Sequence, residues 1–284
     1  MSRLANTGSE TPDLSAPPPR PGLEVAFAAP TLASQTMIPT RFLHGDAARA
    51  RFGPPVDRLA EALTRSDPLA DAVVASFARA PRGEGFRQLD LALARGLAGV
   101  SGADESLRAL LADAERTPVW VDPARLERGA RFFLRSGLFG GIVLGAESLV
   151  LGYASPGGNK PLVWTGALEE RAARRVGETA RFVEAVTQPG QLARSGAGFA
   201  ITLKVRVMHA EVRRLIHASD RFDVAAWGEP INQHDMAATI LLFSVAVLDG
   251  LEKLGLRVSR EDADDFVHLW AYIAHLMEIG RAHV

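Results

Sequence analysis

Residues 199–218, FAITLKVRVMHAEVRRLIHA, predict a long amphipathic helix. Neither proline nor glycine interrupts these twenty residues, and both would weaken a helix interior. The side chains that share one helical face recur at spacings of three, four and seven: Thr202, Val205, Val212 and Ile216. His209 lies in the middle of that face. We therefore expect a buried helix whose apolar side carries a single imidazole.

The same helical periodicity extends in both directions from about residue 41 to residue 277. Asp122 before Pro123, and Ser259 three residues before Asp262, are typical helix starts. Only two short runs alternate as strands do, at 119–121 and 162–164. We expect an all-α, multi-helix domain, with helices over about 57–66, 68–80, 84–98, 103–114, 123–136, 138–152, 167–187, 199–218, 232–255 and 260–277.

Composition excludes several classes of protein. The 284 residues are 47% hydrophobic and 23% charged with a net charge of −1, which suits one globular domain with tails. Near-neutral charge argues against a non-specific nucleic-acid binder. The chain has no cysteine, which excludes disulfides, zinc–thiolate sites, iron–sulfur clusters and a thiolate-ligated haem.

The two ends of the chain look unlike the middle. Residues 1–40 are rich in proline and small polar residues and predict a flexible segment. Residues 41–277 form the expected helical domain. The last seven residues, 278–284, match the translation of a common sequencing-adapter oligonucleotide. We therefore expect that the natural protein continues beyond residue 277.

The apolar segments predict a cytoplasmic protein. The short apolar run at 25–29 lacks the preceding cationic segment of a secretion signal. The longest apolar stretches, 138–151 and 236–251, are shorter than a bilayer span, and the first contains Glu147. We expect no transmembrane segment.

Arg175 and Thr179 lie where the helix 167–187 should be apolar. The apolar stripe of that helix comprises Leu168, Ala172, Val176, Val183 and Val186. A buried guanidinium needs an anion or a wet cavity. One reading pairs Arg175 with a carboxylate of a neighbouring helix or lets it reach the surface. The other makes it part of a binding site.

His209 also has two readings. A histidine on an apolar face is commonly a core residue with one satisfied nitrogen. However, Arg206 stands one turn before it and Arg213 one turn after it. This bracket suits a planar cofactor with an axial nitrogen ligand and negatively charged substituents, unless the arginines belong to a solvated face. Thr239 lies on the apolar stripe of the helix 232–255, where its hydroxyl can bond to its own helix.

Standard catalytic motifs are missing from the sequence. It contains no His-Glu-x-x-His, no Walker-type phosphate loop and no Gly-x-Ser-x-Gly. The absence of Glu-x-x-His argues against a carboxylate-bridged di-iron bundle. His268 and His275, seven residues apart with Tyr272 between them, are too distant to share a metal as helical neighbours do. We expect these three to line a polar patch.

A set of motifs resembles one known family. They are Thr165-Gly166-Ala167-Leu168; Arg175-x-x-x-Thr179-x-x-Phe182; Val205-Arg206-Val207-Met208-His209-Ala210-x-Val212-Arg213; and Trp227-Gly228-x-Pro230-Ile231-Asn232-Gln233 followed by Thr239. Over about 120–277 they are similar, in order and separation, to the catalytic domain shared by bacterial latex-clearing (rubber) oxygenases and the fungal mycophenolic-acid pathway oxygenase.

The resemblance implies a globin-like all-α fold around a b-type haem. His209 would be the proximal iron ligand, and Arg175 and Thr179 would lie in the distal chamber or behind it. Arg206 and Arg213 would meet the haem propionates, and Thr239 would support the haem pocket. The absence of cysteine fits histidine ligation.

The implied activity is cleavage of carbon–carbon double bonds with molecular oxygen. Two family residues do not carry over. Glu178 stands where the distal lysine precedes the motif threonine. Counting back without gaps places the expected catalytic glutamate near Asn159, and Glu147, Glu169 and Glu170 are the candidates to substitute for it. The resemblance therefore favours a haem oxygenase for a smaller isoprenoid or unsaturated lipid over polyisoprene, with a possible electron donor. The alternatives are a non-catalytic haem- or lipid-binding protein and a cofactor-free helical interaction domain.

Overall fold

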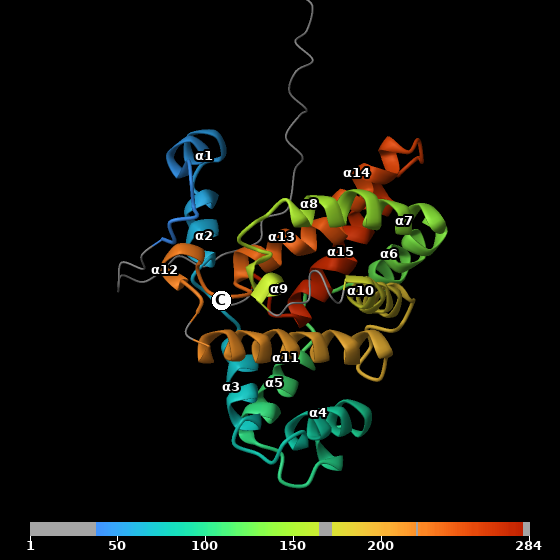
Figure 1. Cartoon of the computed structure of the whole chain (residues 1–284). Coiled ribbons are helices and arrows are strands. Elements are labelled where there is room, and N and C mark those ends of the chain that lie inside the picture. Colours follow the sequence, from blue (N-terminus) through green and yellow to red (C-terminus); the bar gives the residue numbers. More distant parts are fainter. Residues whose placement is uncertain (1–37, 165–171, 220, 281–284) are drawn as a thin grey trace, which may run out of the picture.

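The computed structural model describes residues 38–164, 172–219 and 221–280, and within these ranges every regular element is helical (Figure 1). The predicted all-α class is therefore confirmed. The elements are α1 (Gly45–Phe52), α2 (Pro55–Ala62), α3 (Pro68–Phe77), α4 (Glu84–Arg95), a 3-10 turn η1 (Leu97–Gly99), α5 (Glu105–Ala114), α6 (Pro123–Ser136), α7 (Leu138–Val143), a π-helical turn η2 (Leu144–Ser148), α8 (Leu149–Tyr153), α9 (Lys160–Trp164), α10 (Ala172–Thr187), α11 (Ala197–Ala218), α12 (Val224–Trp227), α13 (Gln233–Phe243), α14 (Val245–Lys253) and α15 (Arg260–Leu276).

Capping residues start the helices as the sequence predicts. The Asp122 carboxylate accepts a hydrogen bond from the Ala124 N–H at 2.9 Å, at the start of α6. Both predicted strands are wrong, since 162–164 belong to α9 and 119–121 lie in a turn. Such short runs have no partner strand here, and local bonds satisfy their backbone instead, for example Leu162 N–H to Asn159 O at 3.0 Å.

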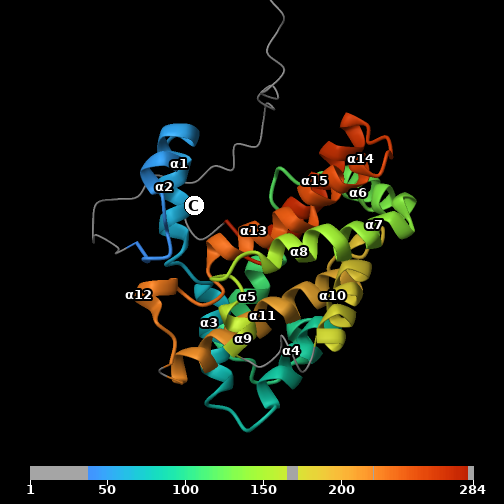
Figure 2. The same cartoon turned by 45° about the horizontal axis from the view of Figure 1, so that its top comes forward.

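Helix α11 is the centre of the fold. Helices α3 and α4 pack on one side of it, and α9, α10 and α15 lie on the other (Figures 1 and 2). Phe199, Leu203 and Val207 of α11 are buried in the main apolar core. The helix predicted from 199–218 thus exists with slightly wider bounds, and it separates the two halves of the domain.

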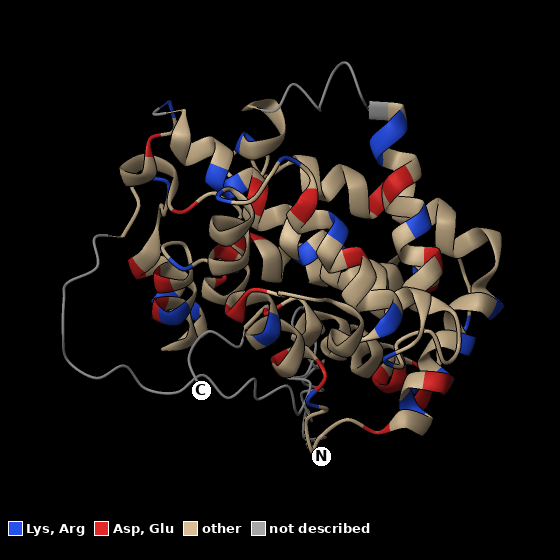
Figure 3. Cartoon of the chain, turned by 90° about the horizontal axis from the view of Figure 1, so that it is seen from below, with Lys and Arg blue, Asp and Glu red and all other residues tan. Residues whose placement is uncertain are grey.

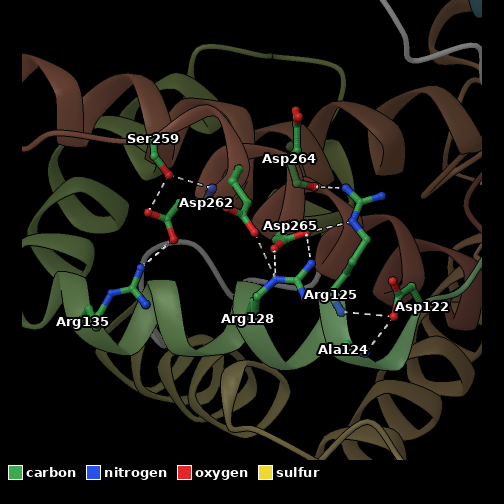
Figure 4. Close-up of polar contacts among 10 residues, drawn as sticks. Asp122, Ala124, Arg125, Arg128, Arg135, Ser259, Asp262, Asp264 and Asp265 are labelled. Carbon is green, nitrogen blue, oxygen red and sulfur yellow. Dashed lines mark hydrogen bonds and ion pairs between the residues drawn. The ribbon is translucent and has the colours of Figure 1, made fainter.

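Helices α6 and α15 pack closely against each other, and ion pairs between arginines of α6 and aspartates of α15 join them (Figure 4). A methyl group at Gly129 would lie 2.4 Å from the backbone oxygen of Asp265. The Asp265 carboxylate accepts hydrogen bonds from Arg125 at 2.8 Å and from Arg128 at 2.5 Å. Burial alone would raise the pKa of Asp265, but the bonds from Arg128 and Arg125 outweigh it and hold that pKa below its usual value.

The predicted polar patch on α15 is a buried aromatic cluster instead. His268 and His275 are each 8% exposed and lie edge-on to the Trp120 ring, with centroids 5.6 and 5.9 Å from it. Tyr272 stacks on His275. His268 Nε2 accepts the backbone N–H of Asp122 at 3.0 Å. These side chains therefore fix the start of α6.

One helical stretch among the described residues is long and apolar enough to cross a membrane. It is Gln233–Lys253, with a mean hydropathy of 1.4, and 28% of its apolar window is buried. The pair Pro123–Ser136 and Leu138–Tyr153 meets the same criterion only as one span bent by 86°. The sequence expectation considered only residues 236–251, which are part of this longer stretch. Core helices of soluble proteins also have this length and composition.

Charges of both signs are interspersed over the described part of the chain (Figure 3). Many of them form ion pairs across or along helices, such as Lys204 with Asp90 at 2.7 Å and Arg135 with Asp262 at 2.6 Å. The view from below shows no separate basic region, in keeping with the near-neutral composition.

Candidate functional site

The apolar face of α11 is closed at its ends and open in its middle. Thr202 and Ile216, near the two ends, are fully buried. Between them Met208 is 48% exposed, and His209 is half-buried. Val205 and Val212, on either side of the histidine, are half-buried too, so the middle of this face is covered less completely than its ends.

His209 makes no hydrogen bond to any residue that the structure describes. Among the described residues, therefore, none satisfies a ring nitrogen of His209, and the choice between the two interpretations of this residue stays open. His217 and His234, by contrast, lie 2.6 and 3.0 Å from oxygen partners.

The electrostatic surroundings of His209 keep its ring uncharged. Burial, with smaller contributions from the nearby positive charges of Arg213 and Arg175, lowers the pKa of His209 to about 4. The ring is therefore neutral at pH 7. A neutral imidazole keeps a nitrogen lone pair for a metal ion.

Helix α10 is open over its first turns. Val183 and Val186 in its second half are buried, as predicted, and Phe182 is buried as well. Val176, which was predicted to continue that buried stripe, is 50% exposed. The predicted apolar face of α10 is therefore buried in the second half of the helix and exposed at Val176, near the start of its described part. The motif at 165–168 and the predicted first turn of this helix lie outside the described residues.

Arg175 is half-buried on this open part of α10, and Thr179 is exposed one turn later. Arg175 has no carboxylate partner among the described residues. The neighbouring Arg174 does have one, Glu178, at 2.8 Å. Since its charge depresses the pKa of His209, Arg175 lies within electrostatic reach of the imidazole.

Arg206 has carboxylate partners within the chain. Its side chain is 1% exposed, and its guanidinium donates to both oxygens of Asp67, at 2.7 and 3.0 Å. It also donates to the Leu276 carbonyl at 3.1 Å and to Glu278 at 3.1 Å. These contacts make Arg206 a buried link between α11, α3 and the end of α15.

Glu278 and the two residues after it lie within the segment that the sequence assigns to an adapter. In the structure Glu278 and Ile279 are 8% exposed. The Gly280 N–H donates to the side chain of Gln233 at 2.9 Å. The origin of 278–284 stays a prediction, and residues 281–284 lie outside the described residues.

Like Arg206, Arg213 has hydrogen-bond and ion-pair partners within the chain. It forms an ion pair with Asp71 and donates to the carbonyls of Pro230 and Ile231, at 3.0 and 3.2 Å. The contact of Arg206 and Arg213 with haem propionates stays a prediction. Sequence reasoning missed Asp67 and Asp71 as partners of these arginines. Asp67 precedes Pro68 as a typical helix start, and Asp71 follows it four residues later on α3.

The motif at 227–233 positions the start of α13. Gly228 has φ of +76°, and a side chain there would lie 2.4 Å from the Leu63 carbonyl oxygen. Ile231 also has a positive φ, +53°, which is rare for a β-branched residue. Asn232 then caps α13 by accepting the Asp235 N–H at 2.9 Å. Arg213 and these contacts together hold a strained turn in place.

Three further motif positions make local bonds. Thr239 is half-buried, and its hydroxyl donates to the Asp235 carbonyl of its own helix at 2.8 Å, so its role in a haem pocket stays a prediction. Glu178 is exposed and pairs with Arg174. The Asn159 amide donates to the carbonyls of Gly152 and Ser155, at 3.0 and 2.6 Å.

The site therefore combines a neutral imidazole and a half-buried guanidinium, neither of which has a hydrogen-bond or carboxylate partner among the described residues, with exposed apolar side chains on the same two helices. Among the described residues, no group of three or more His, Asp or Glu side chains could hold a metal ion. A lone imidazole can ligate iron when a porphyrin supplies the other nitrogen donors. The arrangement defines an all-α protein with a candidate axial histidine.

The comparisons identify the family. Residues 130–284 match the family described as "ER-bound oxygenase mpaB/B'/Rubber oxygenase, catalytic domain", and the chain belongs to it. A rubber oxygenase of Streptomyces sp. (strain K30) is 28% identical over 198 residues, which are 69% of this chain and 47% of that protein. The chain thus spans about half the length of the curated relative it matches.

A solved structure has the same fold. The structure of the latex clearing protein LCP in the closed state aligns with a TM-score of 0.65 and 26% sequence identity. The alignment covers 78% of this chain and 61% of that chain. The predicted resemblance to rubber oxygenases is confirmed.

Proposed function

We propose that this protein is a haem-dependent oxygenase that uses molecular oxygen on a hydrophobic, unsaturated substrate, with His209 as the axial iron ligand. The single observation that carries the proposal is the His209 imidazole, which has a pKa of about 4 and no hydrogen bond among the described residues. The family match at 130–284 supports the same activity.

The residues around His209 fit a b-type haem. A flat apolar cofactor needs apolar contacts beside its axial ligand. Met208, which precedes His209 on α11, and Val176 on the adjacent helix α10 are both about half exposed. A bound haem would supply an iron centre that activates molecular oxygen. His209 would hold the iron, and its neutral state at pH 7 means that no proton has to be displaced first.

Arg175 and Thr179 would act on the substrate side of the site. A guanidinium and a hydroxyl one turn apart can orient a polar oxygen and stabilise negative charge that develops during reaction. The open apolar face of α11 would take up the hydrocarbon part of the substrate and exclude water from it. A small isoprenoid or unsaturated lipid meets these requirements.

One observation favours a second candidate, a haem- or lipid-binding protein without turnover. The Asn159 amide at the position of the expected glutamate is engaged with two backbone carbonyls, so it offers no general base. Glu178, at the position of the distal lysine, is paired with Arg174.

Absorbance spectroscopy tests the haem assignment. Protein produced with a haem supply should show a strong Soret band after gel filtration, and His209→Ala should lose it. The matched control is His217→Ala on the same helix, whose ring pairs with Glu229 and which should keep the band. An unchanged band in His209→Ala would refute the ligand assignment.

Oxygen consumption distinguishes the two candidates. An oxygenase should consume oxygen with at least one member of a panel of isoprenoids and unsaturated lipids, whereas a binding protein should consume none beyond autoxidation. The haem-loaded protein is the proper sample for both arms, so that a negative result refers to turnover and not to missing cofactor.

A further inference from the structure

Arg175 differs from the other partly or fully buried arginines whose contacts are known. Arg206 pairs with Asp67, and Arg213 pairs with Asp71. Five half-buried arginines elsewhere in the described chain also have carboxylate partners: Arg41, Arg65, Arg125, Arg194 and Arg214. Arg175 is half-buried as well but has no such partner among the described residues.

An unpaired guanidinium in partly buried surroundings is costly, because its hydration is incomplete and no counter-charge replaces it. The charge of Arg175 reaches His209, where it depresses the pKa of the imidazole. His209 itself is neutral and cannot supply the missing negative charge. An anion bound at Arg175 would relieve this cost and would lie beside the candidate iron site.

Exposed apolar side chains on α10 and α11 define what else the anion must carry. Val176 is 50% exposed, and Met208 on α11 is 48% exposed. A ligand that covers these side chains gains the free energy of apolar burial. Arg175 offers one positive charge, and the nearby Glu178 is already neutralised by Arg174. One positive charge matches a monoanion, and the planar guanidinium fork fits a carboxylate in a bidentate manner.

We infer that Arg175 receives the carboxylate of an otherwise apolar molecule that lies against the open faces of α10 and α11. The inference rests on the proposed function in that both concern the same site. Two molecules could supply the carboxylate, an acid substrate such as an unsaturated fatty or isoprenoid acid, and the porphyrin through a propionate. The structure favours a propionate at Arg175 more than the sequence did. Arg206 and Arg213, the partners that the sequence predicts for the propionates, already pair with Asp67 and Asp71.

The test measures binding by the full chain, with each acid compared with a neutral counterpart. In the first arm, calorimetry compares dodecanoate with 1-dodecanol on cofactor-free protein. In the second arm, quenching of tryptophan fluorescence compares iron protoporphyrin IX with its dimethyl ester. The variants are Arg175→Gln, the charge-retaining Arg175→Lys, and Arg174→Gln as the matched control, since Arg174 is exposed and paired. Thermal melts establish that each variant is folded.

The expected result is that Arg175→Gln weakens binding of the acid by about 10- to 100-fold in at least one arm, which is the usual range for a charge-assisted hydrogen-bonded pair. Binding of the neutral counterpart, and binding by Arg174→Gln, should be unchanged. Arg175→Lys should lose less affinity than Arg175→Gln, because lysine keeps the charge but not the bidentate fork. The arm that responds identifies the source of the carboxylate.

Two outcomes would overturn the inference. One is equal binding of acid and neutral ligand by the unmodified protein in both arms. The other is an equal loss of affinity in Arg174→Gln and Arg175→Gln. Failure of the proposed function looks different, since the unmodified protein would then bind neither porphyrin while the fatty-acid arm still reports on Arg175.

Discussion

Replacing Arg206 with methionine distinguishes a structural role from a cofactor-binding role for this arginine. Its side chain is 1% exposed and makes two hydrogen bonds to Asp67, which is itself 7% exposed on the side chain. Arg206→Met would leave the Asp67 carboxylate buried without its counter-charge. Breaking a buried ion pair in this way costs about 3–5 kcal/mol, a large part of the roughly 5–15 kcal/mol that stabilises a typical domain.

Urea unfolding of the cofactor-free protein measures this cost. We expect Arg206→Met to lower the free energy of unfolding by about 3–5 kcal/mol and the melting temperature by on the order of 10 °C. The double variant Arg206→Met/Asp67→Asn should recover part of the loss, because the neutral amide is less costly to bury and can still cap α3. The control Arg214→Met removes only a half-exposed pair with Glu211 and should change stability by less than about 1 kcal/mol.

The reasoning is refuted if cofactor-free Arg206→Met is as stable as the unmodified protein while its affinity for haem falls. That pattern would mean that the guanidinium meets a propionate, as the family resemblance implies, and that its bonds to Asp67 contribute little.

Three further predictions concern the glycines and the pH dependence. Gly129→Ala should destabilise the protein by about 1–3 kcal/mol, because the added methyl group would meet the backbone of Asp265 at 2.4 Å. Gly177→Ala, where the added methyl group would have nothing within 4 Å, should stabilise the protein by up to about 1 kcal/mol. Denaturant unfolding of both variants measures these opposite changes, and equal changes would contradict the close packing of α6 on α15. Gly228→Ala should lower the free energy of unfolding by more than about 1 kcal/mol, since φ is +76° and ψ is −170° at this position. A variant with the same melting temperature as the unmodified protein would contradict the strained turn. Because the pKa of His209 is lowered to about 4, its ring stays neutral as the pH falls, and porphyrin affinity should be constant from pH 7.5 to 5.5 and decline only near pH 4. An ordinary histidine ligand would instead lose affinity tenfold per pH unit below about 6.5. That result would show that His209 is not the ligand or is not shielded.

Most of the fold could be predicted because its determinants are local. Helix starts depend on residues such as Asp122 and Ser259, whose side chains bond to backbone groups two or three positions away. The short helix α1 escaped prediction because it buries no residue and shows almost no amphipathic pattern. The run at 162–164 was misread because three alternating residues do not distinguish a strand from a single helical turn.

The site was predictable only in part. The placement of His209 on an apolar face follows from spacing along one helix, and so does that of Arg175. The partners of Arg206 and Arg213 do not, because Asp67 and Asp71 lie about 140 positions earlier and meet α11 only after α3 has packed on it. A cationic pair around an imidazole looks the same in sequence whether it faces a cofactor or internal carboxylates.

Helix α11 is clamped at two points two turns apart, and the imidazole lies between them. Both ion pairs form within the polypeptide, so we expect the imidazole to keep the same orientation with and without a bound porphyrin. A scaffold fastened in this way should accept cobalt, manganese or zinc porphyrins by simple exchange, with no refolding step. It offers a route to altered redox chemistry that needs no change of sequence.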